Sequence, residues 1–295
     1  MIKLMATSLF LIANVLVSVQ AAAVDKAPTS EIICQSSDHY CERIIGHSKG
    51  NHELDCTIIR PWAKTDFATR SDYPVIAWAN GWGQGNVNGQ CVSEGYRPGL
   101  IEWATDGNYI VVAANQWSAR DVDVLACLAY VLEHEKAIVD PMKTGLAGHS
   151  QGGGAVIKSG SALKKSVNIT ATIAMNPFGP DWVGAGIQDG PVLILGGDLD
   201  TTTPPASFVN VWEEVQYNAS GGVWAIRDGG THNNDAWSSS GSSCADASMD
   251  NFGQFQSVSG LWWDWHLNGN GDAGTLQSEF DSGLSGNWST EFILH

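Results

Sequence analysis

The sequence is poor in positive charge. It has 15 Lys and Arg residues against 31 Asp and Glu residues, which gives a formal net charge of -16 at pH 7. A nucleic-acid backbone or an anionic membrane surface would repel such a chain over most of its surface. We therefore expect no nucleic-acid partner.

The sequence also lacks an apolar run of the roughly 20 residues that span a bilayer. Its one long apolar stretch, residues 4–17, follows Lys3 and precedes the small residues 21–23. This order of charge, apolar run and small residues is typical of a secretory signal peptide. We expect residues 1–23 to be a signal peptide cleaved near Val24, and the mature chain to be secreted to the periplasm or the medium without a stable membrane anchor.

Proline is scarce, and no repeat or linker divides the chain. The 295 residues include only 10 Pro, and 43% of them are hydrophobic against 16% charged. Such a composition is typical of a globular protein rather than of a disordered one. The sequence therefore predicts a single domain over residues 24–295.

Zinc-type C-x-x-C spacing is absent as well. In an exported chain an even number of cysteines suggests disulfides, with a pairing that sequence alone leaves open. No metal or organic cofactor is called for by these residues. The six cysteines are Cys34, Cys41, Cys56, Cys91, Cys127 and Cys244.

Short apolar runs alternate along the chain with longer helical or loop segments. This alternation predicts an α/β fold with a mostly parallel, twisted sheet flanked by helices. An amphipathic helix is expected over residues 122–133, and another apolar helix ends at residues 261–267. The expected strands are 57–60, 73–79, 109–114, 144–148, 171–175, 191–195 and 222–226.

One motif carries chemistry: Gly148-His149-Ser150-Gln151-Gly152, a G-x-S-x-G sequence. It follows the expected strand 144–148 and precedes a helix-compatible run over residues 153–163. A serine on such a tight strand-to-helix turn is exposed in a strained backbone geometry, and glycines flank it because a Cβ does not fit there. Ser150 is therefore a candidate nucleophile.

An acid and a base follow in the order that such a serine requires. Serine needs a histidine to take its proton and a carboxylate to orient that histidine. Asp198 and Asp200 follow the expected strand 191–195, and His232 follows the strand 222–226. Because the carboxyl ends of parallel strands share one edge of a sheet, we predict a triad of Ser150, His232 and Asp200, with Asp198 as the weaker candidate for the acid. His149 is expected to pack under the turn rather than to act as a base.

These features together resemble the α/β-hydrolases, and among them the bacterial cutinases and polyester (PET) hydrolases. The resemblance covers about residues 55–267. It rests on the segments 74–82 and 100–112, the serine motif 148–154, the spacing 200–204 and Gly230-Thr231-His232.

The resemblance implies a serine carboxylic-ester hydrolase with Ser150 as nucleophile, His232 as base and Asp200 as acid. It also implies an oxyanion hole formed by the backbone N–H groups of Trp82 and Gln151, with Trp82 and Phe178 against the substrate. About 15 residues separate the strands that end near residue 175 and begin at 191, which is too few for a large cap domain. We therefore expect an open site for bulky or polymeric esters.

Several alternatives stay open. The family's motifs are shared by lipases, small-ester carboxylesterases and chlorophyllase-like enzymes. The 13 Trp residues also permit a non-catalytic glycan-binding module, although Trp262 and Trp265 share a helical face that suits a core. Residues 268–279 resemble a calcium loop imperfectly, with Asn268 at its first position and Ala273 where a glycine is required. Oligomeric state is not predicted.

Overall fold

The computed structural model describes residues 32–35, 40–45, 56–61, 72–81, 96–114, 121–163, 167–179, 190–232, 255–284 and 286–294. The expected signal peptide, residues 1–23, lies outside the described residues. Among those described, no helix is both long and apolar enough to cross a membrane.

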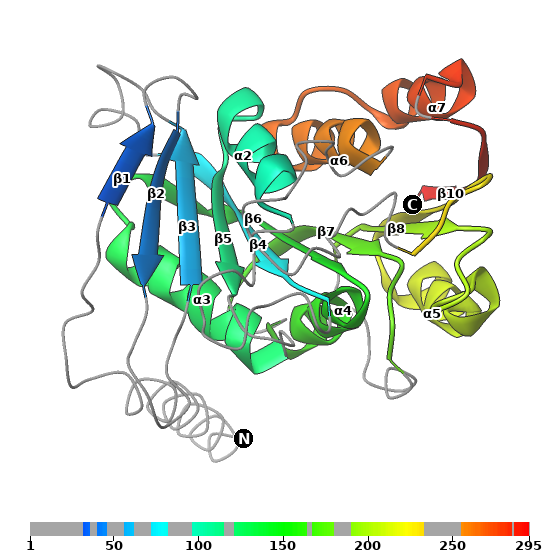
Figure 1. Cartoon of the computed structure of the whole chain (residues 1–295), viewed down its shortest axis with the longest axis horizontal. Helices are drawn as coiled ribbons and strands as arrows, with labels where there is room; N and C mark the ends of the chain where they lie inside the picture. The colour runs from blue at the N-terminus through cyan, green and yellow to red at the C-terminus, as the bar shows by residue number, and fades with distance from the viewer. Residues whose placement is uncertain are drawn as a thin grey trace, which may run out of the picture.

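The described strands form one ten-stranded sheet in the order β1-β2-β3-β5-β4-β6-β7-β8-β9-β10 (Figure 1). The inner strands β5, β4, β6, β7, β8 and β9 run parallel, and the strands outside them pair antiparallel. The strands are β1 Ile32–Gln35, β2 Tyr40–Ile45, β3 Cys56–Pro61, β4 Tyr73–Ala79, β5 Ile110–Ala114, β6 Val139–His149, β7 Ile169–Met175, β8 Val192–Gly197, β9 Gly221–Arg227 and β10 Trp288–Leu294.

Helices cover both faces of the sheet, with α2, α6 and α7 on one side and α3, α4 and α5 on the other (Figure 1). The expected α/β class and the mostly parallel sheet are therefore confirmed. The helices are α2 Arg97–Asp106, α3 Asp121–His134, α4 Gln151–Leu163, α5 Val209–Asn218, α6 Phe255–Trp263 and α7 Ala273–Ser282, with a 3₁₀ turn at Pro205–Ser207 and a π-helical turn at Asp264–Asn268.

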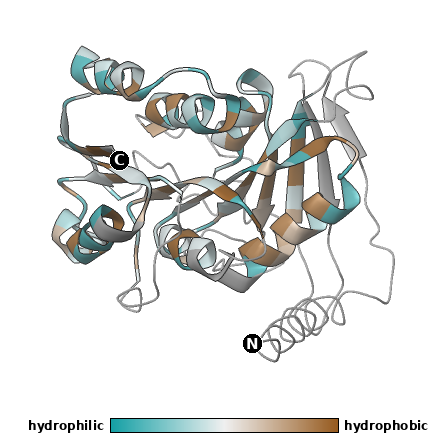
Figure 2. Ribbon diagram, turned by 180° about the vertical axis from the view of Figure 1, so that it is seen from behind, coloured by the Kyte–Doolittle hydropathy of each residue, from teal (hydrophilic) through white to brown (hydrophobic). Residues whose placement is uncertain are grey.

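The side chains of β4 show why the sheet needs two layers of helices. All seven of its residues are buried, because successive side chains point to opposite faces and both faces are covered. Ile76 and Trp78 enter the core beneath α2 and α6, whereas Val75 and Ala77 enter the core beneath α3. Figure 2 shows hydrophobic residues on the central strands and on the helices that cover them.

The tryptophans of α6 belong to this core. Trp262 and Trp263 are buried, and Trp265, in the π-helical turn that follows α6, is partly buried against the same cluster. Trp262 and Trp263 therefore do not supply the exposed aromatic surface that a glycan-binding module would need.

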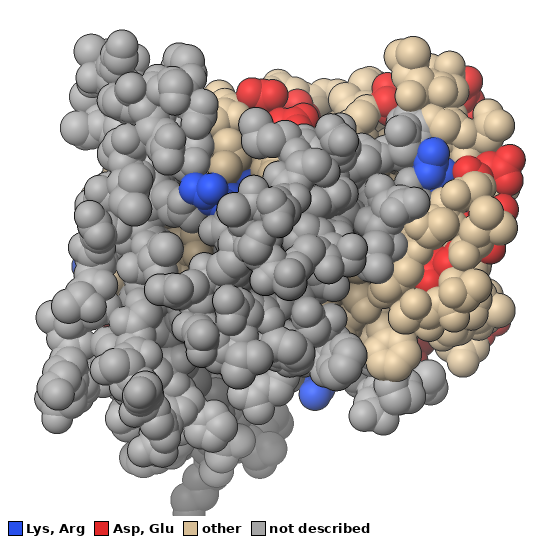
Figure 3. Space-filling model, viewed as in Figure 1, with Lys and Arg blue, Asp and Glu red and all other residues tan. Residues whose placement is uncertain are grey.

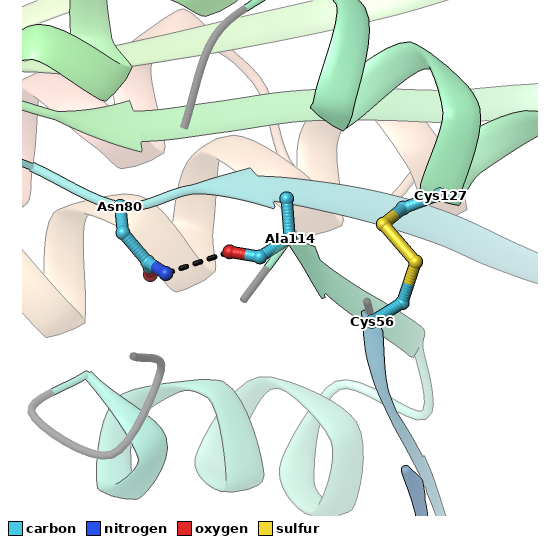
Figure 4. The surroundings of a disulfide bond; sticks show 4 residues. All are labelled: Cys56, Asn80, Ala114 and Cys127. Atoms are coloured by element: carbon cyan, nitrogen blue, oxygen red, sulfur yellow. Dashed lines mark hydrogen bonds between the residues drawn. A yellow bond between two sulfur atoms is a disulfide. The ribbon is translucent and has the colours of Figure 1, made fainter. Parts of the chain in front are cut away.

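One disulfide joins Cys56 at the start of β3 to Cys127 in α3 (Figure 4). The register of β1 and β2 places Cys34 opposite Cys41. Cys91 and Cys244 lie outside the described residues.

Candidate active site

Ser150, Asp200 and His232 lie at one edge of the sheet because each follows the carboxyl end of a parallel strand. Ser150 comes directly after β6, Asp200 follows β8 and His232 follows β9. The strands β6, β7, β8 and β9 are consecutive neighbours in the sheet. The structure therefore brings together three side chains that are 82 residues apart at most.

The backbone at Ser150 has the strained geometry that the motif predicts. Its φ is 55°, in the left-handed region that a residue with a Cβ rarely occupies. The flanking glycines allow close packing: a Cβ on Gly148 would lie 2.4 Å from the Gly152 carbonyl oxygen, and one on Gly152 would lie 2.1 Å from the Ala79 carbonyl oxygen. The turn from β6 into α4 thus presses against the end of β4 and leaves room for no other residue at these two positions.

Hydrogen bonds connect the three side chains in sequence. His232 Nε2 lies 2.9 Å from Ser150 Oγ, and His232 Nδ1 lies 2.7 Å from Asp200 Oδ2. A carboxylate only accepts hydrogen bonds, so Nδ1 carries the proton and Nε2 is the acceptor for the serine hydroxyl. This is the tautomer that lets an imidazole take a proton from Ser150.

The Asp200 carboxylate accepts hydrogen bonds from several donors of its own loop. The backbone N–H groups of Thr202 and Thr203 donate to Oδ1 at 2.8 and 2.7 Å, and the Thr203 hydroxyl donates to Oδ2 at 2.7 Å. Burial alone would raise the pKa of Asp200, but the hydrogen bonds from His232 and Thr203 outweigh it and hold the pKa below its ordinary value. The carboxyl therefore stays ionised beside His232.

Asp198 has a different partner. Its Oδ1 accepts from the backbone N–H of Gly229 at 2.7 Å, and its side chain is exposed. The expected preference for Asp200 over Asp198 as the neighbour of His232 agrees with this geometry.

His149 is buried under the turn, as expected, and both of its ring nitrogens are engaged. Nδ1 lies 2.8 Å from Tyr96 Oη, and Nε2 lies 2.8 Å from the backbone carbonyl oxygen of His232. Burial and the neighbouring His232 lower the pKa of His149 to about 3. A neutral imidazole with both nitrogens in hydrogen bonds is a poor candidate for a general base.

Asn176 is a site residue that the sequence analysis did not identify. It is fully buried at the end of β7, has a φ of 40°, and donates from Nδ2 to the His232 carbonyl oxygen at 3.0 Å. The available signal was its position: it follows an apolar strand at the same sheet edge as the triad.

Two backbone segments flank Ser150 where an oxyanion would form. Gln151 opens α4, at the helix end that carries the positive half of the dipole. Gly81 approaches from the end of β4, and a Cβ on it would lie 3.1 Å from Ser150 Cβ. Trp82, the other expected donor and an expected substrate contact, lies outside the described residues.

Asn80 fixes the segment that leads to Gly81. Its Nδ2 donates to the Ala114 carbonyl oxygen at 2.7 Å, and its Oδ1 accepts from Trp78 Nε1 at 2.9 Å. Ala114 is the register partner of Cys56, so this anchor lies beside the disulfide (Figure 4).

Phe178 lies near the candidate nucleophile. Its backbone N–H donates to the Ser150 carbonyl oxygen at 2.8 Å, and its side chain is 47% exposed. It is thus an exposed aromatic residue at the site's edge.

The acidic residues of the loop that resembles a calcium site accept hydrogen bonds from protein groups. Asp272 caps α7 by accepting from Thr275 N at 2.8 Å, and Glu279 accepts from the Ser257 hydroxyl. Within the described ranges, no group of three or more His, Cys, Asp or Glu side chains is placed to hold a metal ion.

Comparison with models of known protein families found no match, and comparison with curated proteins found none either.

Proposed function

We propose that the protein is a secreted serine carboxylic-ester hydrolase of the α/β-hydrolase superfamily, similar to cutinases and polyester hydrolases. The observation that carries the proposal is the hydrogen-bonded series Ser150–His232–Asp200 at the end of a parallel sheet, with Ser150 at a φ of 55° on a strand-to-helix turn. A positive φ on a serine between β6 and α4 is costly, and such strain is characteristic of functional sites.

The proposed reaction is acyl transfer in two steps. Ser150 Oγ attacks the ester carbonyl carbon while His232 Nε2 takes the hydroxyl proton, and Asp200 stabilises the imidazolium. The oxyanion that forms is held by the backbone N–H groups of Gln151 and Trp82. The C–O bond to the alcohol then breaks, the alcohol leaves with the proton from Nε2, and an acyl-serine remains.

Water completes the cycle. His232 removes a proton from the water as its oxygen attacks the acyl carbon, and the same proton returns to Ser150 Oγ when the carboxylic acid leaves. No metal or organic cofactor takes part in this proposal.

Features of the sheet edge favour a large or apolar ester. Phe178 and Leu199 follow β7 and β8 with exposed fractions of 47% and 59%, so apolar surface lies at the edge that carries the triad. Residues 176–191 join β7 to β8, a connection too short for a large helical cap. A site with an apolar rim and no large cap inserted between β7 and β8 suits an aliphatic or aromatic polyester.

The test is hydrolysis of p-nitrophenyl esters from acetate to palmitate, together with release of soluble products from a polyester film. Residues 24–295 are used as wild type and as Ser150→Ala, with Ser278→Ala, an exposed serine on α7, as the matched control. We expect Ser150→Ala to lower kcat by at least about 10⁴-fold, with an unchanged melting temperature, and Ser278→Ala to match the wild type.

The substrate profile separates the alternatives. Film release with short-chain turnover supports the polyesterase assignment. Turnover that rises with chain length without film release indicates a lipase, and turnover of acetate and butyrate alone indicates a small-ester carboxylesterase. Absence of Ser150-dependent turnover on every ester would overturn the enzyme proposal and direct attention to glycan binding.

A further inference from the structure

The backbone carbonyl oxygen of His232 accepts two hydrogen bonds from buried side chains. His149 Nε2 lies 2.8 Å from this oxygen, and Asn176 Nδ2 lies 3.0 Å from it. The exposed fractions of His149 and Asn176 are 1% and 0%. Two desolvated donors therefore converge on the main chain of the proposed base, not on its imidazole.

The donor role of His149 follows from its partners. A carbonyl oxygen only accepts, so His149 Nε2 carries the proton. Nδ1 of the neutral ring then accepts from the Tyr96 hydroxyl at 2.8 Å, and Tyr96 Oη accepts in turn from the Gly81 N–H at 3.2 Å. These bonds link the His232 backbone to the segment beside Ser150.

Asn176 connects the same carbonyl to a second strand. Its Oδ1 accepts from the backbone N–H of Gly197 at 3.1 Å, at the end of β8. The residue adopts a φ of 40°, which asparagine tolerates better than most residues. Its amide thus connects the end of β8 to His232, on the loop after β9.

We infer that His149 and Asn176 are positioning residues that hold the backbone of His232 by its carbonyl, so that its imidazole contacts Ser150 and Asp200 together. The inference rests on the proposed function, because it assigns His232 the role of base. His232 lies on a loop five residues beyond the end of β9 at Arg227, and its side chain is 14% exposed. The hydrogen bonds of the imidazole to Ser150 and Asp200 do not hold the main chain of His232. The side chains of His149 and Asn176 hold it through its carbonyl oxygen.

The test compares variants that remove a donor with variants that keep it. His149→Leu removes the imidazole donor, whereas His149→Gln keeps an N–H donor near the position of Nε2. Asn176→Gly removes the amide and suits the positive φ. Asn168→Gly, at the opposite end of β7, and His134→Leu, on the exposed end of α3, are matched controls.

We expect His149→Leu and Asn176→Gly each to lower kcat by roughly 10- to 100-fold with little change in KM, because a misplaced base affects the reaction step and not substrate binding. His149→Gln should recover most of the wild-type kcat, and the control variants should retain it. Wild-type kcat in folded Asn176→Gly or His149→Leu would overturn the inference. A loss in His149→Gln as large as in His149→Leu would overturn it as well.

A measurement without substrate separates this inference from the proposed function. The proton between His232 Nδ1 and Asp200 is followed by NMR in the same variants. We expect its signal in the wild type, in His149→Gln and in the controls, and its loss or broadening in His149→Leu and Asn176→Gly. If the wild type hydrolyses no ester, the proposed function fails while this signal still decides the positioning role; an unchanged signal in both donor-deleted variants contradicts that role.

Discussion

At the scale of single residues, the site distinguishes two carboxylates that leave the same strand. Asp200 contacts His232 and is buried, whereas Asp198 accepts from a backbone N–H and is exposed. The two side chains have the same chemistry, so only their hydrogen-bond partners and burial distinguish them as candidates for the acid.

Replacing the two carboxylates by amides tests this difference. Asp200→Asn should lower kcat by about 10⁴-fold, because an amide favours the wrong imidazole tautomer. Asp198→Asn keeps an oxygen for the Gly229 N–H and should leave kcat within a few fold of the wild type. Kinetics on one p-nitrophenyl ester measures both, and the reverse ranking would assign the acid to Asp198.

Two histidines with lowered pKa values, His149 and His266, give the protein a pH-dependent stability. Burial lowers the pKa of His149 to about 3 and that of His266 to about 4, whereas an unfolded histidine titrates near 6.5. The unfolded chain therefore binds more protons than the folded one below that pH. The free energy of unfolding should fall as the pH drops from about 6.5 towards 4, by up to about 1.4 kcal/mol per pH unit for each histidine.

Urea unfolding at several pH values between 7 and 4 measures this dependence. His149→Gln should make the pH dependence shallower because the variant loses one such group. His134→Gln, at an exposed position, is the control and should follow the wild type. A dependence unaffected by His149→Gln would contradict the contribution of the buried imidazole.

At the scale of elements, the turn from β6 into α4 is a close contact between backbones. Gly152 lies against the end of β4, and a Cβ there would also lie 2.6 Å from the Asn80 carbonyl oxygen. The segment that leads to Gly81 thus meets the helix that begins after Ser150.

Alanine substitutions at two helical glycines test this contact, one at the contact and one away from it. Gly152→Ala should destabilise the protein by about 3 kcal/mol or more, because only backbone atoms can give way, and should lower ester turnover. Gly260→Ala, in α6 where a Cβ meets nothing within 4 Å, should stabilise the protein by about 0.5–1 kcal/mol. Thermal unfolding of both variants measures these changes in stability. A Gly152→Ala variant as stable as the wild type would contradict the close packing.

The elements that the sequence predicts correctly are those with a simple hydrophobic pattern. The expected strands correspond to β3 through β9, and the helix over residues 122–133 corresponds to α3. β1, β2 and β10 were not predicted. In β10, Trp288, Thr290 and Phe292 alternate with more exposed Ser289 and Glu291, as suits an antiparallel edge strand rather than a buried run.

The candidate site divides in the same way. Ser150, Asp200 and His232 stand out because their chemistry and order follow a motif, and the structure brings them together. Asn176 and Tyr96 do not stand out in the sequence, because their hydrogen-bond partners in the site lie far away along the chain. Tyr96 meets His149 across 53 residues, a contact that no local pattern encodes.

At the scale of the whole molecule, the sheet with helices on both faces carries a disulfide and an acidic surface region. The disulfide fixes β3 to α3 across 71 residues of chain. Red acidic side chains gather along the edge of the molecule that holds α5 and α7 (Figure 3).

Removing this disulfide should cost stability and not chemistry. The double variant Cys56→Ala/Cys127→Ala releases a closed loop of this length, which by the chain-entropy estimate lowers the free energy of unfolding by about 4 kcal/mol. Ester turnover at 25 °C should stay within a few fold of the wild type, because neither β3 nor α3 carries a residue of the triad. Urea unfolding and kinetics check both parts, and inactivity of a folded variant would show that the crosslink shapes the site.

Under the proposed function, the spacing of the site along the chain links catalytic competence to the completion of folding. Ser150 follows β6, but Asp200 and His232 follow β8 and β9, and the carbonyl of His232 reaches its donors only when β9 has paired with β8. A chain that has formed β3 through β6 holds Ser150 without Asp200 and His232. Under the proposed mechanism, newly made or partly unfolded molecules are therefore latent, and hydrolysis begins when the last parallel strand joins the sheet.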